Sequence, residues 1–255
     1  MRNASLRLLI ALCLLPLTGC PGSVTADGID GFTVASASWL VLVSGNAQTH
    51  QLVASSVDGY CGKRQSAESK RQKAFEQHQE RLEGGATLCE SLDTYYDDLA
   101  AAMNPLDKAG AKHLNVVLAR DVDSQDLDAI TAPAAGHYQQ LGGVSDGTFT
   151  AQLQYHEAKF NQQFADAWDC EALSEEQLDD TIAIATLLAE STAEVEFPTS
   201  YLLSAAELDI EEASDSKRSV SLDGDLLEQG TTIGSFQASF TATECLVELS
   251  DQLNF

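Results

Sequence analysis

Apolar and polar residues alternate over three long stretches in the last third of the chain. The stretches are residues 201–210, 219–227 and 231–245, and Gly224-Asp225 and Gln229-Gly230 supply turn residues. Such alternation is typical of a strand with one face on a core and the other in water. The pattern therefore predicts an antiparallel meander that closes the fold.

Similar patterns predict four earlier strands. The first, residues 33–43, ends in a continuously apolar run, and residues 51–57 are placed to be its hairpin partner. Residues 113–119 form a short strand-like stretch, and residues 148–156 alternate well. We expect these strands and the meander to form one largely antiparallel sheet or a sandwich.

Two segments between these strands carry helix signals. Residues 63–83 contain no Gly or Pro and are rich in helix formers, although their apolar stripe is thin. Thr87 and Glu90 then fit a capping box, in which the hydroxyl accepts from a free helical N–H and the carboxylate reciprocates. Apolar residues at helical spacing follow as far as Met103, and Pro105 ends the pattern.

A further helix is expected after Ser174 and Gln177, which fit another capping box. The segment 182–188 has helical spacing, but its alternation of Ile and Ala also suits a strand, and the sequence leaves both readings open. Together these elements predict an α+β fold. We expect a mainly antiparallel β-sheet or sandwich with two or three helices, in a single soluble domain over residues 32–255.

The first twenty residues have the three-part layout of a secretory signal. Arg2 and Arg7 make a positive start, residues 8–17 form a short apolar core, and small residues precede Cys20. The core is too short to span a bilayer as a helix, which takes about 20 residues. We therefore expect residues 1–19 to be a signal peptide.

Leu17-Thr18-Gly19-Cys20 resembles the bacterial lipobox. The resemblance implies diacylglycerol on the Cys20 thiol, cleavage before Cys20, and a fatty acyl chain such as palmitate on the freed amine. Residues 20–31 would then be the lipid anchor and a flexible tether. Two or three acyl chains hold a protein firmly, because each buried CH₂ contributes about 0.8 kcal/mol. Pro21 is not the Asp that retains many Gram-negative lipoproteins at the inner membrane, which favours the outer membrane.

The net charge of the chain limits the kinds of molecule that it can bind. The chain has 39 acidic and 14 basic residues, a net charge of −25, and it should repel nucleic acid because the phosphate backbone is bound by Lys and Arg. The basic residues cluster in residues 63–81. They could dock on anionic lipid head groups, or they could offset the acidity of their own protein on a solvated helix face. We favour the second interpretation.

Four cysteines remain after the signal and the anchor: Cys61, Cys89, Cys170 and Cys245. In an exported chain they suggest two disulfides, and their wide spacing does not suit zinc. We prefer the pairs Cys61–Cys89 and Cys170–Cys245, because each pair lies within one half of the chain. The first pair conflicts with an antiparallel packing of the two predicted helices, since both cysteines lie near helix N-termini.

The sequence shows no catalytic signature. It contains no H-E-x-x-H motif, no G-x-S-x-G elbow and no P-loop, and its acidic stretch 121–128 does not match an EF-hand. We expect no catalytic residue, no metal and no cofactor. In outline the mature chain is similar to uncharacterised Gram-negative lipoproteins of myxobacterial type, a resemblance that implies no activity.

The sequence thus predicts a membrane-anchored lipoprotein of the cell envelope that acts as a non-catalytic binding or scaffold protein, with its protein partner unknown. Two alternatives stay open: a secreted hydrolase with an unrecognised site, and an envelope assembly accessory that uses the basic stretch. A pocket with convergent polar side chains would favour the hydrolase, and a large exposed apolar patch would favour a scaffold or accessory.

Overall fold

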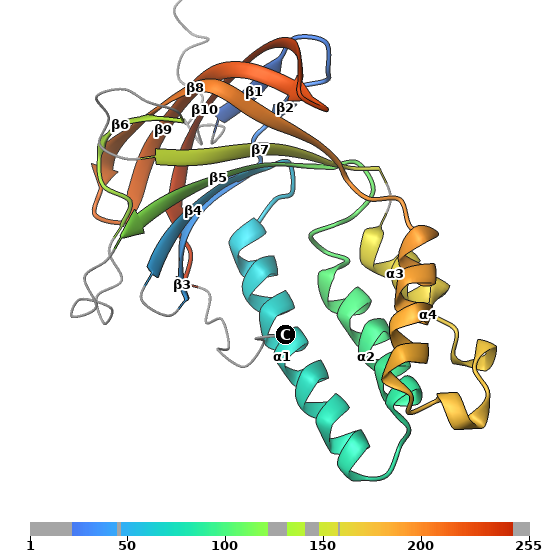
Figure 1. The fold of residues 1–255 in the computed structure, drawn as a ribbon. Helices are drawn as coiled ribbons and strands as arrows, with labels where there is room; N and C mark the ends of the chain where they lie inside the picture. Colours follow the sequence, from blue (N-terminus) through green and yellow to red (C-terminus); the bar gives the residue numbers. More distant parts are fainter. Residues whose placement is uncertain (1–21, 45–46, 122–131, 141–147, 158, 247–255) are drawn as a thin grey trace, which may run out of the picture.

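The structure, a computed structural model, describes residues 22–44, 47–121, 132–140, 148–157 and 159–246 (Figure 1). The strands in these ranges are β1 (Gly22–Ala26), β2 (Phe32–Thr33), β3 (Ser36–Ser44), β4 (Ala47–Ser55), β5 (Ala111–Asp121), β6 (Gly136–Gln139), β7 (Thr148–His156), β8 (Thr199–Ser214), β9 (Lys217–Glu228) and β10 (Thr231–Glu244). The helices are α1 (Tyr60–Glu83), α2 (Leu88–Met103), α3 (Phe160–Ala167) and α4 (Thr181–Ala193), with short 3₁₀ turns η1 (Cys170–Ala172) and η2 (Glu175–Gln177).

Seven strands close into a barrel, in the order β10-β3-β4-β5-β7-β8-β9 and back to β10. Neighbours in the ring are antiparallel except β10 and β3. These two run parallel, with Thr243 opposite Ser38 and Glu244 opposite Trp39. β1 pairs with β10 and carries β2 at its outer edge, and β6 pairs with β8, so these three strands lie outside the ring (Figure 1).

The predicted fold, a sheet or sandwich with two or three helices, is therefore wrong, because the strands form a closed barrel. In a sandwich and in a small barrel alike, each strand alternates between a face on the core and a face outside it. The alternation in the sequence cannot separate the two architectures. What separates them is the parallel β10–β3 pairing, which joins segments about 200 residues apart.

The interior of the barrel holds the main hydrophobic core. Trp39, Leu52, Leu203 and Phe236 are almost completely buried, and apolar side chains from all seven ring strands pack with them. Fully burying one such side chain is worth about 1.5–3 kcal/mol relative to leaving it exposed. The inward positions are the apolar positions of the alternating stretches, so the sequence pattern selects this core even though it does not specify the barrel.

A bulge in β8 explains a glycine that the sequence pattern placed in a turn. The β8–β9 register shifts around Ala205, whose φ is 48°. Gly224 lies across from the bulge in the middle of β9, where an added Cβ would meet the Cβ of Ala206 at 2.8 Å. The turn predicted at Gly224 is therefore wrong. The other predicted turn is confirmed, because Gln229 and Gly230 join β9 to β10 with positive φ angles.

Most of the predicted elements are confirmed. The predicted strands correspond to β3, β4, β5, β7, β8, β9 and β10, and residues 63–83 lie in α1. The capping box of Thr87 and Glu90 is present at the start of α2, and residues 182–188 are helical, in α4. The sequence did not predict β1, β2, β6 or α3. Within the range expected to be a tether, Gly22–Ala26 forms strand β1 and pairs with β10.

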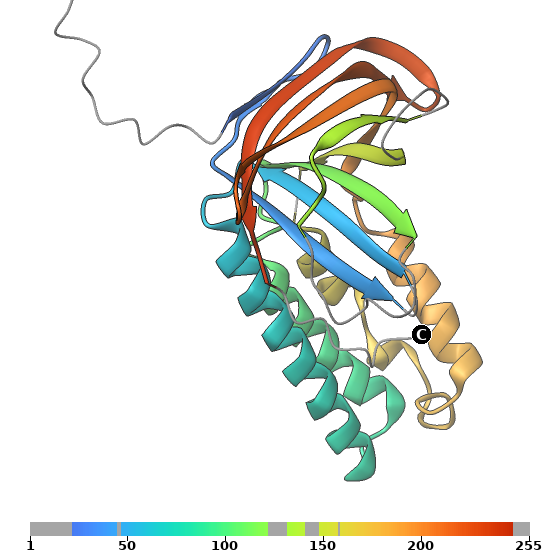
Figure 2. The same ribbon diagram turned by 90° about the vertical axis from the view of Figure 1, so that its left-hand side faces the viewer.

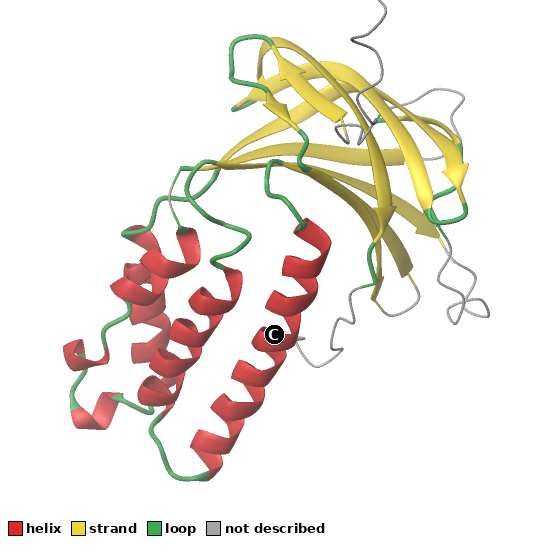
Figure 3. Ribbon diagram, turned by 180° about the vertical axis from the view of Figure 1, so that it is seen from behind, coloured by secondary structure: helices red, strands yellow, loops and turns green. Residues whose placement is uncertain are grey.

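The described helices lie together on one side of the barrel (Figure 2 and Figure 3). α1 and α2 run antiparallel, and α2 lies between α1 and the pair α3 and α4 (Figure 1). This helical layer has a small core of its own around Trp168, Ile184 and Leu187. Val53 of β4 packs against Tyr60 at the start of α1, which joins the layer to the barrel. None of the described helices is long and apolar enough to cross a membrane.

Two disulfides, Cys61–Cys245 and Cys89–Cys170, fasten the helical layer. The expectation that these four cysteines are oxidised is confirmed, but the preferred pairs Cys61–Cys89 and Cys170–Cys245 are wrong. Because α1 and α2 are antiparallel, Cys61 and Cys89 lie toward opposite ends of the helical hairpin. Cys61 instead bonds to the residue that follows β10, and Cys89 bonds to η1.

Candidate functional site: a polar pocket between barrel and helices

A pocket of about 220 Å³ lies where the barrel meets the helical layer. Its walls come from β4, β5 and β7, from the start of α1, the end of α2 and the start of α3. Pockets for drug-sized ligands measure about 300–1,000 Å³. This pocket, which we call the His113 pocket, therefore suits a smaller molecule.

Strand alternation determines which side chains face the pocket. On β5, Leu114 points into the barrel core, so His113 and Asn115 on either side of it point outward. The antiparallel β5–β7 register puts Gln154 opposite His113 and brings His156 onto the same face. The two imidazole rings meet edge to face, with their centroids 5.2 Å apart.

His113 is 5% exposed, and its Nε2–H donates to the carbonyl oxygen of Leu106 at 3.1 Å. Because a carbonyl oxygen can only accept, this contact places the proton of the neutral ring on Nε2 and leaves Nδ1 as an acceptor. Nδ1 has no partner among the described residues. Burial and the neighbouring His156 lower the pKa of His113 to about 4, against weaker opposing effects of the Leu106 carbonyl and Asp107. The ring is therefore neutral at pH 7.

Asp107, in the turn between α2 and β5, is 3% exposed. Its Oδ2 accepts from the backbone N–H of Asn161 at 3.3 Å and from the side-chain amide of Asn161 at 2.7 Å, so the start of α3 fixes the carboxylate. Its Oδ1 has no partner in the described part of the chain, and the same holds for Nδ1 of His156. Burial lowers the pKa of His156, and the charge of Asp107 opposes that shift.

A row of side-chain amides crosses β4, β5 and β7 beside the histidines. Nε2 of Gln51 donates to Oδ1 of Asn115 at 3.3 Å, and Nδ2 of Asn115 donates to Oε1 of Gln154 at 3.0 Å. These amides supply one another with partners. The unpaired acceptors of the pocket are therefore Nδ1 of His113 and Oδ1 of Asp107, while Nδ1 of His156 is a third buried polar atom without a described partner.

The His113 pocket thus gathers hydrogen-bond acceptors. Bulk water does not reach Nδ1 of His113, Nδ1 of His156 or Oδ1 of Asp107, and a buried polar atom without a partner costs about 1–3 kcal/mol. Such an arrangement suits a ligand that brings donors. The described lining includes no Ser, Thr or Cys nucleophile. Within the described ranges, no group of three or more His, Cys, Asp or Glu side chains is placed to hold a metal ion.

Of the residues singled out from the sequence, Arg64 of the basic stretch 63–81 lines this pocket, and the four disulfide-bonded cysteines are not among its lining residues. Cys20 and the signal segment 1–19 are outside the described residues, as is the acidic stretch 121–128 apart from Asp121. Sequence reasoning did not identify the two histidines and the carboxylate of the pocket as a site. The histidines do occupy outward positions of two predicted strands. These positions indicate a shared site only when the two strands are known to pair.

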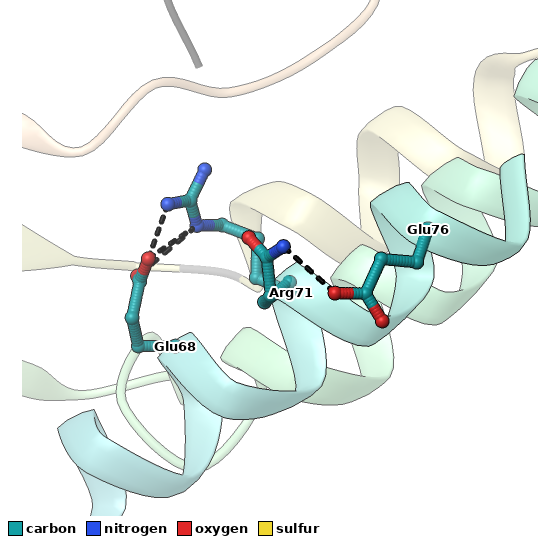
Figure 4. Close-up of polar contacts among 4 residues, drawn as sticks. Glu68, Arg71 and Glu76 are labelled. Atoms are coloured by element: carbon teal, nitrogen blue, oxygen red, sulfur yellow. Dashed lines mark hydrogen bonds and ion pairs between the residues drawn. The ribbon is translucent and has the colours of Figure 1, made fainter. Parts of the chain in front are cut away.

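The basic stretch 63–81 lies in α1 and is partly neutralised there. The carboxylate of Glu68 accepts from Nε of Arg71 at 3.1 and 3.0 Å and forms an ion pair with the same guanidinium (Figure 4). One turn further along α1, Oε1 of Glu76 accepts from the side-chain amide of Gln72 at 2.9 Å (Figure 4). Because Glu68 is 6% exposed, its ion pair with Arg71 is partly buried rather than on a solvated helix face.

The His113 pocket therefore joins groups far apart in the sequence: a carboxylate from a turn, histidines from two strands, and Arg64 from α1. Such an assembly follows no linear motif. No protein-family model, no curated protein and no solved structure significantly matches this chain, so the interpretation of the pocket depends on its own geometry.

Proposed function

We propose that this chain is an envelope lipoprotein, held at the outer membrane by lipid on Cys20, whose domain binds a small polar ligand in the His113 pocket without transforming it. The lipobox-like residues 17–20 support the anchor. The acceptor-rich lining of the pocket, which lacks a Ser, Thr or Cys nucleophile among its described residues, supports non-catalytic binding.

A single observation carries the binding role: Oδ1 of Asp107 and Nδ1 of His113 are unpaired acceptors on almost completely buried side chains. In folded proteins about nine in ten or more buried polar groups have a partner. Two exceptions in one pocket therefore point to a partner that is not part of the described chain. A ligand with hydrogen-bond donors would offset about 1–3 kcal/mol for each group that it satisfies.

The binding role can be tested by NMR on the mature chain carrying Cys20→Ser, labelled with ¹⁵N-histidine, during a screen of small polar metabolites. A bound donor should shift the Nδ1 resonance of His113, because ring-nitrogen shifts report hydrogen bonding. His113→Leu should abolish the binding, whereas His137→Leu, in β6 and outside the pocket lining, should preserve it. A screen in which no compound shifts the resonances of His113 or His156 would refute the binding role.

The anchor has its own test. Cys20→Ser should abolish incorporation of a fatty-acid analogue and leave the precursor uncut, because the thiol accepts the lipid before the signal is removed. Equal labelling of the wild type and the variant would show that the lipobox assignment is wrong.

A secreted hydrolase is the second candidate, since convergent polar side chains favour it. The specific observation is the unpaired Nδ1 of His113, which would accept a proton from an attacking water admitted with the ligand when the lining side chains shift. Under this alternative, His113→Gln would abolish turnover of a hydrolysable ligand but leave its binding measurable. Under the proposed function, the bound ligand is recovered unchanged after prolonged incubation.

A further inference from the structure

Arg64 adds an unpaired positive charge to the His113 pocket. Its side chain is half-buried and lines the pocket, and it forms no hydrogen bond or ion pair with any described residue. Its charge acts on the neighbouring Tyr60, whose pKa is raised by burial and lowered to a lesser extent by Arg64. The pocket therefore presents a guanidinium without a described partner as well as the unpaired acceptors of Asp107 and His113.

We infer that the His113 pocket binds a small zwitterion of the α-amino acid class, with its ammonium group on Asp107 and His113 and its carboxylate on Arg64. This inference rests on the proposed binding function and specifies the chemistry of its ligand.

The acceptors distinguish an ammonium group from a hydroxyl. An ammonium group has three N–H donors and no acceptor, and the pocket has two unpaired acceptors on almost completely buried side chains, one of which belongs to the carboxylate of Asp107. A hydroxyl brings only one donor, and its own lone pairs would face the remaining acceptors. Hydrogen bonds between ionised groups are also roughly twice as strong as neutral ones. The lining therefore favours an ammonium group over a sugar or polyol.

Arg64 distinguishes a zwitterion from a simple amine. An amine would satisfy the carboxylate of Asp107 but leave the guanidinium without a partner, whereas the carboxylate of a zwitterion can accept two parallel N–H bonds from that guanidinium. Apolar surface from Met103, Leu106 and Phe160 completes the walls. In a pocket of about 220 Å³, these walls leave room for a small aliphatic side chain.

Ligand affinity should fall at acidic pH, because protons and the ligand's ammonium group use the same nitrogen. The titratable and charged groups that line the pocket with the two histidines are Asp107 from the turn before β5, and Tyr60 and Arg64 from α1. A proton on Nδ1 of His113 removes an acceptor, and protonation of either histidine adds positive charge near the ammonium group. Because bulk water does not reach these nitrogens, binding also requires the lining side chains to shift as the ligand enters.

Calorimetry with matched ligands tests the inference on the mature chain carrying Cys20→Ser. One comparison sets L-alanine against L-lactate, and L-leucine against 2-hydroxy-4-methylpentanoate, which exchanges only the ammonium group for a hydroxyl. The hydroxy acids should bind about 10- to 100-fold more weakly, as expected for losing charge-assisted hydrogen bonds. The other comparison sets L-leucine against L-leucinamide, which removes the carboxylate and should weaken binding about tenfold.

Two variants assign these preferences to residues. Arg64→Gln should abolish the preference for L-leucine over its amide, whereas Lys73→Gln, on the exposed surface of the same helix, should retain it. Asp107→Asn replaces an acceptor oxygen with a donor and should abolish the preference for L-leucine over its hydroxy acid. Asp98→Asn, in α2 and outside the pocket lining, is its matched control.

Hydroxy acids that bind as tightly as amino acids would overturn the ammonium assignment but leave the small-ligand function standing. A pocket in which neither class binds, and in which a broad metabolite screen shifts neither histidine, would refute the inference and the proposed function together. If Asp107→Asn fails to fold, NMR on the chain without this substitution still tests the inference. L-leucine must then shift the Nδ1 resonance of His113 or His156, and an unchanged spectrum overturns the inference.

Discussion

The barrel and the helical layer are held together by different means. The barrel is a continuous ladder of strand pairs closed around one core, to which Trp39 and Phe236 contribute. The helical layer has smaller apolar clusters, one of them around Trp168, and a disulfide that joins α2 to η1. Every strand of a closed ring has two neighbours, whereas helices that share little apolar surface need an additional tie. The contrast teaches that apolar burial fixes the barrel, while a covalent bond contributes much of the order of the layer.

The His113 pocket lies at the junction of these two parts. Its histidines stand on β5 and β7, whereas Arg64 belongs to α1 and Asp107 follows α2. Side chains on packed strands and helices are positioned more accurately than side chains on loops. The barrel therefore supplies the fixed acceptors, and the layer supplies the charges that are brought to them.

The largest expected effect concerns the Cys89–Cys170 disulfide of the helical layer. Removing Cys89–Cys170 with Cys89→Ala and Cys170→Ala should lower the free energy of unfolding by about 4 kcal/mol, because the bond closes a long loop, with a sequence separation of 81. Hydrogen exchange should show that amides of α3 and α4 lose protection first, while those of β5 keep theirs. Equal loss of protection in β5 would break the contrast between the two parts.

Alanine substitutions at neighbouring leucines compare the stability that the two cores provide. Leu203 in β8 is 1% exposed and Leu202 is 57% exposed, so Leu203→Ala should cost about 3 kcal/mol in urea unfolding and Leu202→Ala less than about 0.5 kcal/mol. In α4 the corresponding pair is the buried Leu187 and the exposed Leu188. Leu187→Ala should cost about 2 kcal/mol, because the small core around it can collapse into the space. A larger loss at Leu187 than at Leu203 would reverse the contrast.

Low pH should lower the free energy of unfolding through His113, which lies at the junction of the barrel and the helical layer. The pKa of His113 falls from an ordinary 6.5 to about 4 on folding, so the unfolded chain takes up the proton first. The associated stability is fully present above pH 6.5 and is lost as the pH falls toward 4. At pH 5 the loss should be about 2 kcal/mol, since each pKa unit corresponds to about 1.4 kcal/mol. Urea unfolding between pH 7.5 and 5 should show it, and His113→Gln, which does not titrate, should show a smaller loss.

The smallest expected effect concerns a local cap of the layer. Thr87→Ala removes the hydroxyl that accepts from the backbone N–H of Glu90 at 3.3 Å and should cost about 1 kcal/mol in urea unfolding. Thr94→Ala, on an exposed face in the middle of α2, is the matched control and should be neutral, because alanine is the better helix former. Equal effects at both positions would show that the cap adds nothing to the layer.

Local pattern predicted most elements because it records which face of each strand or helix is buried. The run 231–245 alternates in the sequence, and the buried residues of β10 follow that alternation. The pairing of β10 with β3 was beyond reach, since every strand edge offers the same backbone donors and acceptors. The disulfide partners failed for a related reason. The antiparallel α1 and α2 argue against Cys61–Cys89, but only the end position of β10 brings Cys245 to Cys61.

The candidate site was out of reach for the same reason. His113 and His156 stand on strands that the sequence predicted, yet their proximity depends on the β5–β7 register. Asp107 lies six positions before His113, but nothing in that spacing indicates that Asn161 holds one of its oxygens and leaves the other free. A site assembled across elements becomes visible only when the elements have been placed.

The closure of the barrel also sets an order of events. β10 supplies the partner for β1, for β9 and for the first half of β3, and Cys245 directly follows it. A chain that emerges from a ribosome or a translocation channel with its N-terminus first must therefore wait with one edge of β1 and one edge of β3 unpaired. During that interval the open edge is a template for association with other chains. The Cys61–Cys245 bond joins α1 to the residue after β10, so its appearance in a pulse-chase experiment should accompany the completion of the ring.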